Sequence, residues 1–263
     1  MYNIKWYQEL AGKYLTYNST LYPMTINADI KLQKVMFELH QSNTDTMNSI
    51  KQLVSLKKVN DIYCLSRSMF ESVVNMGALV SGKIYGGAER FEDFQYVEDY
   101  KTYNKLRTVF PTFTDMVYKQ DIVKKITEQN DKFLKKYKKD NNWCGLNMCE
   151  RTKLIDGSFP PTCSNSKFFE WLYYFFYKLS SSATHRSSTT LKRSIAWLKS
   201  DDSNKNSNSV YPTSNVPNLV LAGFHSLIFY LASIRFISYI LNRTEIESYY
   251  QKETTRIIPV KKN

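Results

Sequence analysis

Residues 61–80, DIYCLSRSMFESVVNMGALV, contain the pattern that decides the fold of this chain. Their apolar side chains recur every three or four residues, the spacing that places side chains on one face of an α-helix. Asn60 or Asp61 is a suitable N-cap for this helix, and Gly86-Gly87 is a suitable stop. The apolar face consists of Ile62, Leu65, Met69, Val73, Met76 and Val80. We therefore expect a helix with one buried face here.

The same spacing extends over most of the chain, and 8 Gly and 7 Pro in 263 residues are too few for a turn-rich β-sandwich. The expected fold class is all-α, a single-domain multi-helix bundle with a long apolar C-terminal helix. We expect an N-terminal helix and linker over residues 1–24, an all-helical domain over 25–250 and a basic C-terminal tail over 251–263. The expected helices cover about 4–15, 27–57, 61–80, 88–109, 114–139, 168–179, 191–198 and 217–250, with loops at 140–166 and 201–209.

Composition and charge narrow the class of protein. Apolar residues make up 43 % of the chain, enough for a full core, so a wholly disordered chain is excluded. Lys and Arg number 36 against 24 Asp and Glu, which gives a formal charge of +12. This charge favours a nucleic acid or another phosphate-bearing ligand as partner. The alternative is that the lysines only solvate helix faces, as over residues 119–139.

The start of the chain and its cysteines indicate a cytoplasmic protein. Residues 1–9 contain no apolar run of signal-peptide length. Four cysteines are too few for a disulfide scaffold, so a reducing compartment is the simpler interpretation. Cys144, Cys149 and Cys163 share one expected loop, but this loop has no C-x2-C pair and no nearby His. We therefore expect no metal site and no cofactor.

The most apolar stretch of the chain covers residues 219–234, and Arg235 interrupts it. A membrane-spanning helix needs about 20 consecutive apolar residues, more than this stretch provides. A central helix that is buried in the bundle fits better, so no stable membrane insertion is expected. A membrane-associated helical protein is the alternative.

A polar line of candidate site residues runs along the helix that starts near Asp61. Arg67 and Glu71 are four residues apart and share a face opposite the Met69 side, and Asn75 extends this line. Arg before Glu is the less stabilising order for an exposed pair, which favours a partly buried pair that orients a site. The alternative is a purely structural ion pair.

A second set of polar residues follows the aromatic helix at 168–179. Tyr177, Ser181 and His185 fall at i, i+4 and i+8, so one continuous helix would point them the same way. His185 is the histidine with polar neighbours in the sequence, and its imidazole can exchange a proton near neutral pH. Residues 171–200 carry five basic residues and no acidic one. We therefore add three residues as ligand-binding candidates beside Asn75: Arg186, Ser187 and Lys192.

These motifs resemble a known family in order along the chain. Arg67-Ser68-Met69-Phe70-Glu71 resembles the R-x-x-x-E helix of the bacterial domain of unknown function 5677. Ala88-Glu89-Arg90-Phe91 is similar to its A-x-R-F helix, and Trp143 is similar to its recurrent Trp. Its Y-x-x-x-S-x-x-x-H-x-S signature is matched by Tyr177, Ser181, His185 and Ser187. The resemblance covers about residues 25–245 and implies an all-helical fold with a shared polar site, but no particular substrate.

The function that these residues favour is a metal-independent, RNA-directed phosphodiester activity, in bacterial defence or stress. In this hypothesis Arg67 stabilises phosphate charge, Glu71 holds Arg67, His185 moves a proton, and Tyr177 and Ser181 position the substrate. The enzyme would be a ribonuclease-like hydrolase. The alternative is a non-catalytic ligand- or partner-binding sensor module. The chain has no glycine-rich phosphate loop, no H-E-x-x-H and no G-x-S-x-G motif, which excludes P-loop, zinc-protease and α/β-hydrolase chemistry.

Overall fold

The structure is a computed structural model that describes residues 4–21, 30–138, 142–162, 165–177, 216–243 and 245–257. The regular elements in these ranges are all helices, which confirms the expected all-α bundle. They are α1 (Ile4–Leu21), α2 (Lys31–Ser55), α3 (Val59–Val80), α4 (Gly87–Val109), α5 (Pro111–Val117), α6 (Gln120–Tyr137), α7 (Met148–Asp156), α8 (Phe168–Leu172), the π-helix η1 (Tyr173–Tyr177), α11 (Val216–Ile240) and α12 (Glu245–Ile257).

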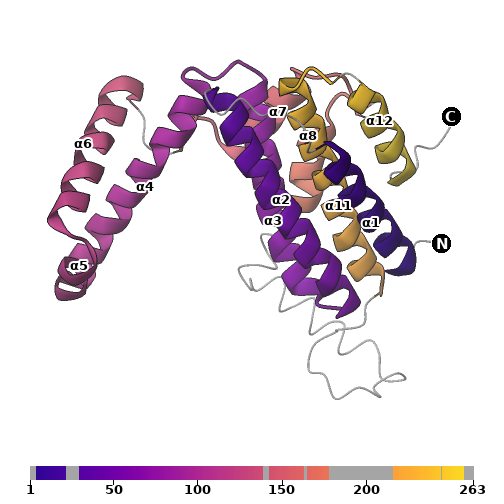
Figure 1. Ribbon diagram of the computed structural model, residues 1–263, viewed down its shortest axis with the longest axis horizontal. Coiled ribbons are helices and arrows are strands. Elements are labelled where there is room, and N and C mark those ends of the chain that lie inside the picture. Colours follow the sequence, from indigo (N-terminus) through magenta and orange to yellow (C-terminus); the bar gives the residue numbers. More distant parts are fainter. Residues whose placement is uncertain are drawn as a thin grey trace, which may run out of the picture.

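The core forms around α11, which packs against α3, α2, α12 and α1 (Figure 1). Few of its side chains are polar, so it can be buried on most of its faces. Phe229, Tyr230 and Phe236 are fully buried, and Gly223 allows the Tyr7 ring of α1 to approach the α11 backbone closely. The expected long apolar C-terminal helix is therefore the centre of the bundle.

The segment Ala222–Ile240 of α11 is long and apolar enough to cross a membrane, with a mean hydropathy of 1.3. In the structure 89 % of this segment is buried against other parts of the chain. The core helix of a soluble protein can have the same length and the same apolar composition. The contacts of this segment are those of a core helix.

Three helices form an arm that projects from the bundle (Figure 1). In this arm α4 and α6 lie side by side, and α5 connects them at the far end. Phe94 packs against Phe133 with 5.6 Å between ring centroids, and the Lys136 ammonium lies 2.6 Å from the Glu89 carboxylate. Apolar side chains therefore hold α4 and α6 together and continue the common core into the arm, and α4 packs on α2 of the bundle.

The N-terminus of α3 and the glycines after it differ from the prediction. The N-cap is Lys58, with no side-chain hydrogen bond, so Asn60 and Asp61 lie inside the helix. The helix already ends at Val80. Gly86, with a φ of 81°, instead occupies the N-cap position of α4, a left-handed conformation that glycine adopts without strain.

Two predicted long helices are each broken once. The expected helix over 114–139 is divided into α5 and α6, because Tyr118 and Lys119 have extended backbone conformations. The expected helix over 217–250 is divided into α11 and α12, and Asn242 in the break has a φ of 53°. Asn is one of the few residues other than Gly that tolerate this left-handed region.

The predicted loop over 140–166 contains a helix, α7. Asn147 caps it: the Asn147 side chain accepts from the Glu150 amide at 3.0 Å, and the Glu150 carboxylate accepts from the Asn147 amide at 2.7 Å. This is a capping box, which satisfies free amides at the start of a helix. The helix positions Arg151 and the buried Ile155 against α3.

The ends of the chain pack on the same bundle. Tyr7, Leu10, Ala11 and Tyr14 of α1 are buried in the common core. Residues 251–257, assigned to the tail in the predicted division, belong to α12, and the buried Glu253 carboxylate accepts from Lys13 at 2.7 Å and Tyr14 at 3.0 Å.

Candidate functional site

The candidate site is built on the polar side of α3, at Arg67, Glu71 and Asn75, which we call the α3 polar face. The Arg67 Nε atom donates to Glu71 Oε1 at 3.1 Å. The Arg67 Nη2 atom donates to the Tyr177 hydroxyl at 3.2 Å, and the guanidinium lies 4.8 Å from the Tyr177 ring centroid. Arg67 and Tyr177 are 110 residues apart, so the fold brings the two predicted halves together at this point.

This cluster is only partly shielded from water. The Arg67 side chain is 19 % exposed and the Glu71 side chain 39 %. Burial opposes the charge on Arg67, but the hydrogen bonds to Tyr177 and Glu71 outweigh it, so the pKa of Arg67 is raised. Burial raises the pKa of Tyr177, and the Glu71 charge raises it further. Arg67 therefore stays cationic and Tyr177 stays protonated near neutral pH.

Asn75 connects the α3 polar face to the loop before α7 and to α7 itself. Its side-chain oxygen accepts a hydrogen bond from Trp143 Nε1 at 3.0 Å and another from Arg151 Nη1. Trp143 is buried and meets the Phe91 ring edge-on at 5.0 Å between centroids. Asn75 thus holds a second arginine next to the α3 polar face.

A third arginine, Arg90, directly precedes Phe91, whose ring packs on Trp143. Burial raises the pKa of the Cys144 thiol, and the positive charges of Arg151 and Arg90 oppose this rise, so both arginines act electrostatically on the same thiol. Arg90 is 7 % exposed, with its guanidinium 4.9 Å from the Tyr137 ring centroid. The Nε atoms of Arg90 and Arg151 are both buried without a hydrogen-bond partner. Within the described ranges, neither arginine forms an ion pair with a carboxylate.

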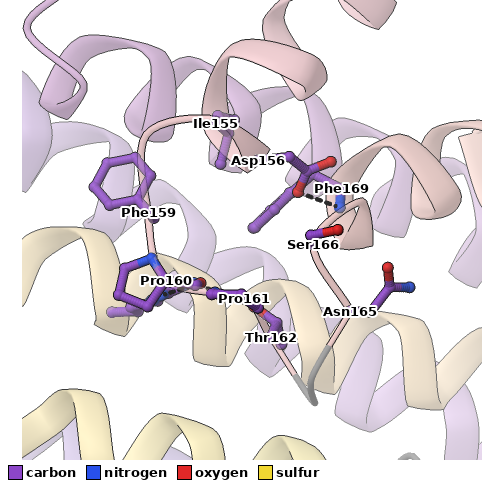
Figure 2. A pocket seen from close by; sticks show the side chains of 10 residues that line it. Ile155, Asp156, Phe159, Pro160, Pro161, Thr162, Asn165, Ser166 and Phe169 are labelled. Carbon is purple, nitrogen blue, oxygen red and sulfur yellow. Dashed lines mark hydrogen bonds between the residues drawn. The ribbon is translucent and has the colours of Figure 1, made fainter.

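Arg235 is a buried arginine with a structural role, and its contacts differ from those of Arg90 and Arg151. It donates to the Glu247 carboxylate at 2.7 and 2.8 Å and to Thr162 Oγ1 at 3.2 Å. It lines a small surface hollow beside α7, α8 and the loop at Pro160–Thr162, and Figure 2 shows the other residues of this lining. In this hollow the Asp156 carboxylate accepts from the amides of Phe169 and Glu170, both at 2.9 Å. Both charged residues that line this hollow, Arg235 and Asp156, thus have hydrogen-bond partners, which indicates that they serve the fold.

The described histidines are core residues. His40 is 1 % exposed, and its ring nitrogens lie 3.0 Å from Ser233 Oγ and 2.6 Å from Asn18 Oδ1. Burial lowers the pKa of His40 to about 4. His225 is 3 % exposed and packs against the rings of Phe175 and Phe176, as expected for a core residue. His40 thus has two polar partners inside the core.

The described residues contain no group of three or more His, Cys, Asp or Glu side chains that could hold a metal ion. Cys144 is buried and donates to Asn142 Oδ1 at 3.4 Å, whereas the Cys149 sulfur lies 3.6 Å from the Tyr174 hydroxyl. Cys163, the third cysteine of the predicted loop, lies outside the described residues.

A family model decides which group of proteins these residues belong to. The model of the family of unknown function DUF5677 matches residues 33–205, about two thirds of the chain. The chain belongs to this family. No curated protein matches the chain, and no solved structure matches it. The DUF5677 segment contains the three arginines and all the predicted site residues, whereas α1, α11 and α12 lie outside it.

Part of the predicted site falls outside the described residues. These site candidates are Ser181, His185, Arg186, Ser187 and Lys192. Their predicted alignment with Tyr177 assumed a regular α-helix, but residues 173–177 form a π-helix. The wider turn of a π-helix changes which side chains share a face. Of the second predicted half of the site, the structure therefore describes Tyr177 alone, and Tyr177 does contact Arg67 of the α3 polar face.

Two arginines of this DUF5677 site were not among the predicted site residues. Arg90 was recognised only as part of the A-x-R-F motif, and Arg151 was not singled out, because its segment was expected to be a loop. The capping-box pattern at Asn147 and Glu150 predicts a helix that would have placed Arg151 on a rigid element. No sequence signal reports that an arginine lacks a carboxylate partner.

Proposed function

We propose that this protein binds RNA phosphates at the α3 polar face and cleaves the RNA without a metal ion. The observation that carries this proposal is the group of three arginines, of which Arg90 and Arg151 have no carboxylate partner within the described ranges. A buried charge that is not compensated costs several kcal/mol, so proteins normally pair it. The negative charge of a bound phosphate would compensate the charges of these arginines.

The chemistry assigned to the predicted residues is the general acid–base cleavage of RNA. His185 removes the proton of a ribose 2′-hydroxyl, and the 2′-oxygen bonds to the adjacent phosphorus. The bond from phosphorus to the 5′-oxygen breaks, and this oxygen takes a proton as it leaves. Arg67 stabilises the additional negative charge on the phosphate in the transition state, and Glu71 holds Arg67 in place.

The remaining candidates position the substrate. Tyr177 supports the Arg67 guanidinium through its hydroxyl and its ring. We assign Ser181, Arg186, Ser187 and Lys192 to contacts with the ribose and phosphates. The products of this reaction are a 2′,3′-cyclic phosphate and a 5′-hydroxyl end, and DNA is not a substrate because it lacks the 2′-hydroxyl.

A non-catalytic sensor is the second candidate function, and one observation favours it. Glu71 and Tyr177 hold the Arg67 guanidinium in place, as a preorganised binding site requires. A sensor would bind the same phosphate-bearing ligand and release it unchanged.

The test is to incubate the purified protein with RNA and with DNA of the same sequence in EDTA. We expect cleavage of the RNA alone, with cyclic-phosphate ends, and at least about a hundredfold slower cleavage by His185→Ala. Lys153→Ala is the control, because Lys153 is an exposed residue of α7 that pairs with Glu170 at 3.6 Å. We expect this variant to cleave RNA like the wild type.

Two outcomes would contradict the proposed activity. Equal cleavage by the wild type and His185→Ala would indicate a contaminating nuclease. Tight binding of RNA without cleavage would leave the sensor as the function.

A further inference from the structure

The far end of the arm exposes a cluster of large apolar side chains. The most exposed is Met116, at 74 %, followed by Val109 and Phe110 at 57 % each and Phe113 at 54 %. We call this cluster the arm tip, and its residues are Val109, Phe110, Phe113, Met116, Val117 and Ile122. These six are nearly half of the large apolar side chains that are exposed in the described part of the chain.

The arm tip lies far from the bundle, so the helices of the bundle do not pack against its apolar side chains. Figure 1 shows α5 at the end of the arm that lies farthest from α11. The side chains that face the interior of the arm, such as Tyr103, Thr114 and Ile126, are buried there. A cluster of exposed apolar side chains costs free energy in water, so such clusters mark binding surfaces.

Basic side chains surround the arm tip. Between residues 105 and 125 the exposed charges are five basic and two acidic, Asp115 and Asp121. The five basic residues, which we call the basic rim, are Lys105, Arg107, Lys119, Lys124 and Lys125. A surface with an apolar centre and a basic rim complements a membrane surface, where acyl chains lie beneath anionic headgroups.

We propose that the arm tip docks the protein on an anionic lipid bilayer, with its apolar side chains at the level of the acyl chains and the basic rim on the headgroups. Each Lys or Arg near an anionic surface contributes about 1 kcal/mol to such binding. The arm thereby holds the bundle, and the site on α3, above the membrane surface. This peripheral binding is distinct from a membrane span, because α11 stays in the core.

The positive charge of the basic rim favours an anionic bilayer over a second copy of this chain or a nucleic acid as the occupant of this surface. In a symmetric dimer the same patch meets itself, so the two basic rims would face each other and repel. A nucleic acid would contact the basic rim but would leave Phe110, Phe113 and Met116 in water. Anionic lipid satisfies both parts of the surface.

The test is co-sedimentation of the full-length protein with vesicles of phosphatidylcholine alone and of phosphatidylcholine mixed with phosphatidylglycerol. We expect binding to the mixed vesicles only, and weaker binding as salt is raised. Phe110→Ser/Phe113→Ser and, separately, Lys119→Glu/Lys124→Glu should each reduce binding at least roughly tenfold. Leu56→Ser/Tyr85→Ser is the control, because these side chains are 64 % and 73 % exposed and do not belong to the arm tip.

Circular dichroism of each variant shows whether it folds, and RNA cleavage by the arm-tip variants should equal that of the wild type. This separates the docking proposal from the proposed function, since either can fail alone. Equal binding to both kinds of vesicle, or none to the mixed vesicles, would overturn the proposal. A concentration-dependent dimer that Phe110→Ser/Phe113→Ser abolishes would overturn it in favour of a second copy of this chain.

Discussion

Among single residues, the buried arginines Arg235 and Arg90 differ in whether a carboxylate pairs with them. Arg235 is surrounded by acceptors, including both carboxylate oxygens of Glu247. Arg90 is 7 % exposed and has no carboxylate partner within the described ranges, and its guanidinium lies 4.9 Å from the Tyr137 ring centroid and 5.9 Å from the Phe133 ring centroid. Cation–π contacts recover about 2 kcal/mol at best, less than the desolvation of a guanidinium. Arg90 thus lowers stability in the free protein, as functional residues often do.

The first prediction compares these two arginines. Arg90→Met should raise the free energy of unfolding by about 1 kcal/mol, because an apolar side chain removes an uncompensated charge. Arg235→Met should lower the free energy of unfolding by about 3 kcal/mol, since this substitution leaves the Glu247 carboxylate without its cationic partner and removes several hydrogen bonds. Urea denaturation of both variants measures the difference. Destabilisation by Arg90→Met would show that Arg90 serves the fold.

The second prediction concerns His40. Its pKa is lowered to about 4 in the folded protein, against about 6.5 in the unfolded chain, so the unfolded chain binds the proton more tightly between these values. This contribution to stability is complete above pH 6.5 and is lost as the pH falls toward 4. From pH 7.5 to 5.0 we expect the free energy of unfolding to fall by about 2 kcal/mol.

The control for this prediction is His40→Gln, which keeps polar atoms near Ser233 and Asn18 but does not titrate. Urea denaturation of both proteins at the two pH values gives the comparison. The same loss of stability in His40→Gln would show that another group causes it.

The residue scale also shows what the sequence could predict of the site. The spacing of Arg67, Glu71 and Asn75 requires only that their segment is helical, so their common face is predictable. The contact between Arg67 and Tyr177 depends on the packing of segments 110 residues apart, which periodicity does not encode. The motif resemblance was the only indication of it.

At the scale of elements, helical periodicity predicts where helices lie better than where they end. The break between α5 and α6 contains no Gly or Pro, and Tyr118 is extended there only in the context of the arm. The break before α12 does carry a signal, because Asn242 adopts a left-handed conformation that Asn tolerates. The helix α7 also carries one, in its capping box.

The third prediction tests the packing between elements at Gly77 of α3. A Cβ atom at this position would lie 2.7 Å from Ile155 Cδ1 and 2.8 Å from Phe236 Cζ, so α3, α7 and α11 meet there without space for a methyl group. Gly77→Ala should therefore lower the free energy of unfolding by about 1–3 kcal/mol, as overpacking does.

Gly12 provides the matched control within a helix. A Cβ atom there would meet only the Lys51 Nζ atom, at 3.8 Å. Gly12→Ala should raise the free energy of unfolding by up to about 1 kcal/mol, because alanine favours the helix. If thermal unfolding shows that Gly77→Ala is neutral or stabilising, the described contact between α3, α7 and α11 is wrong.

At the scale of the whole molecule, the family segment and the bundle do not coincide. The DUF5677 segment supplies the arginines and the arm, but the core closes only when α11 from outside this segment packs on α2 and α3. The all-α bundle and its long apolar helix could be predicted from composition and periodicity. The projection of the arm could not, because it depends on which distant segments α4 and α6 pack against, and periodicity does not encode this.

The three arginines belong to different helices, and only the assembled molecule brings them near one another. Arg67 lies on α3, Arg90 on α4 at the base of the arm, and Arg151 on α7. The positive charges of Arg90 and Arg151 both oppose the rise in the pKa of the Cys144 thiol, and Asn75 connects Arg151 to the α3 polar face. The central claim is that this assembly binds the phosphates of RNA.

The most direct test is the dissociation constant of a short fluorescent RNA, measured by anisotropy for the wild type, Arg90→Met, Arg151→Met and the control Lys153→Ala. Our account predicts that the wild type and Lys153→Ala bind equally and that binding weakens steeply with salt. It also predicts that each arginine variant loses at least about tenfold in affinity while remaining folded. Equal affinity of the wild type and the arginine variants, or no binding by the wild type, would contradict it.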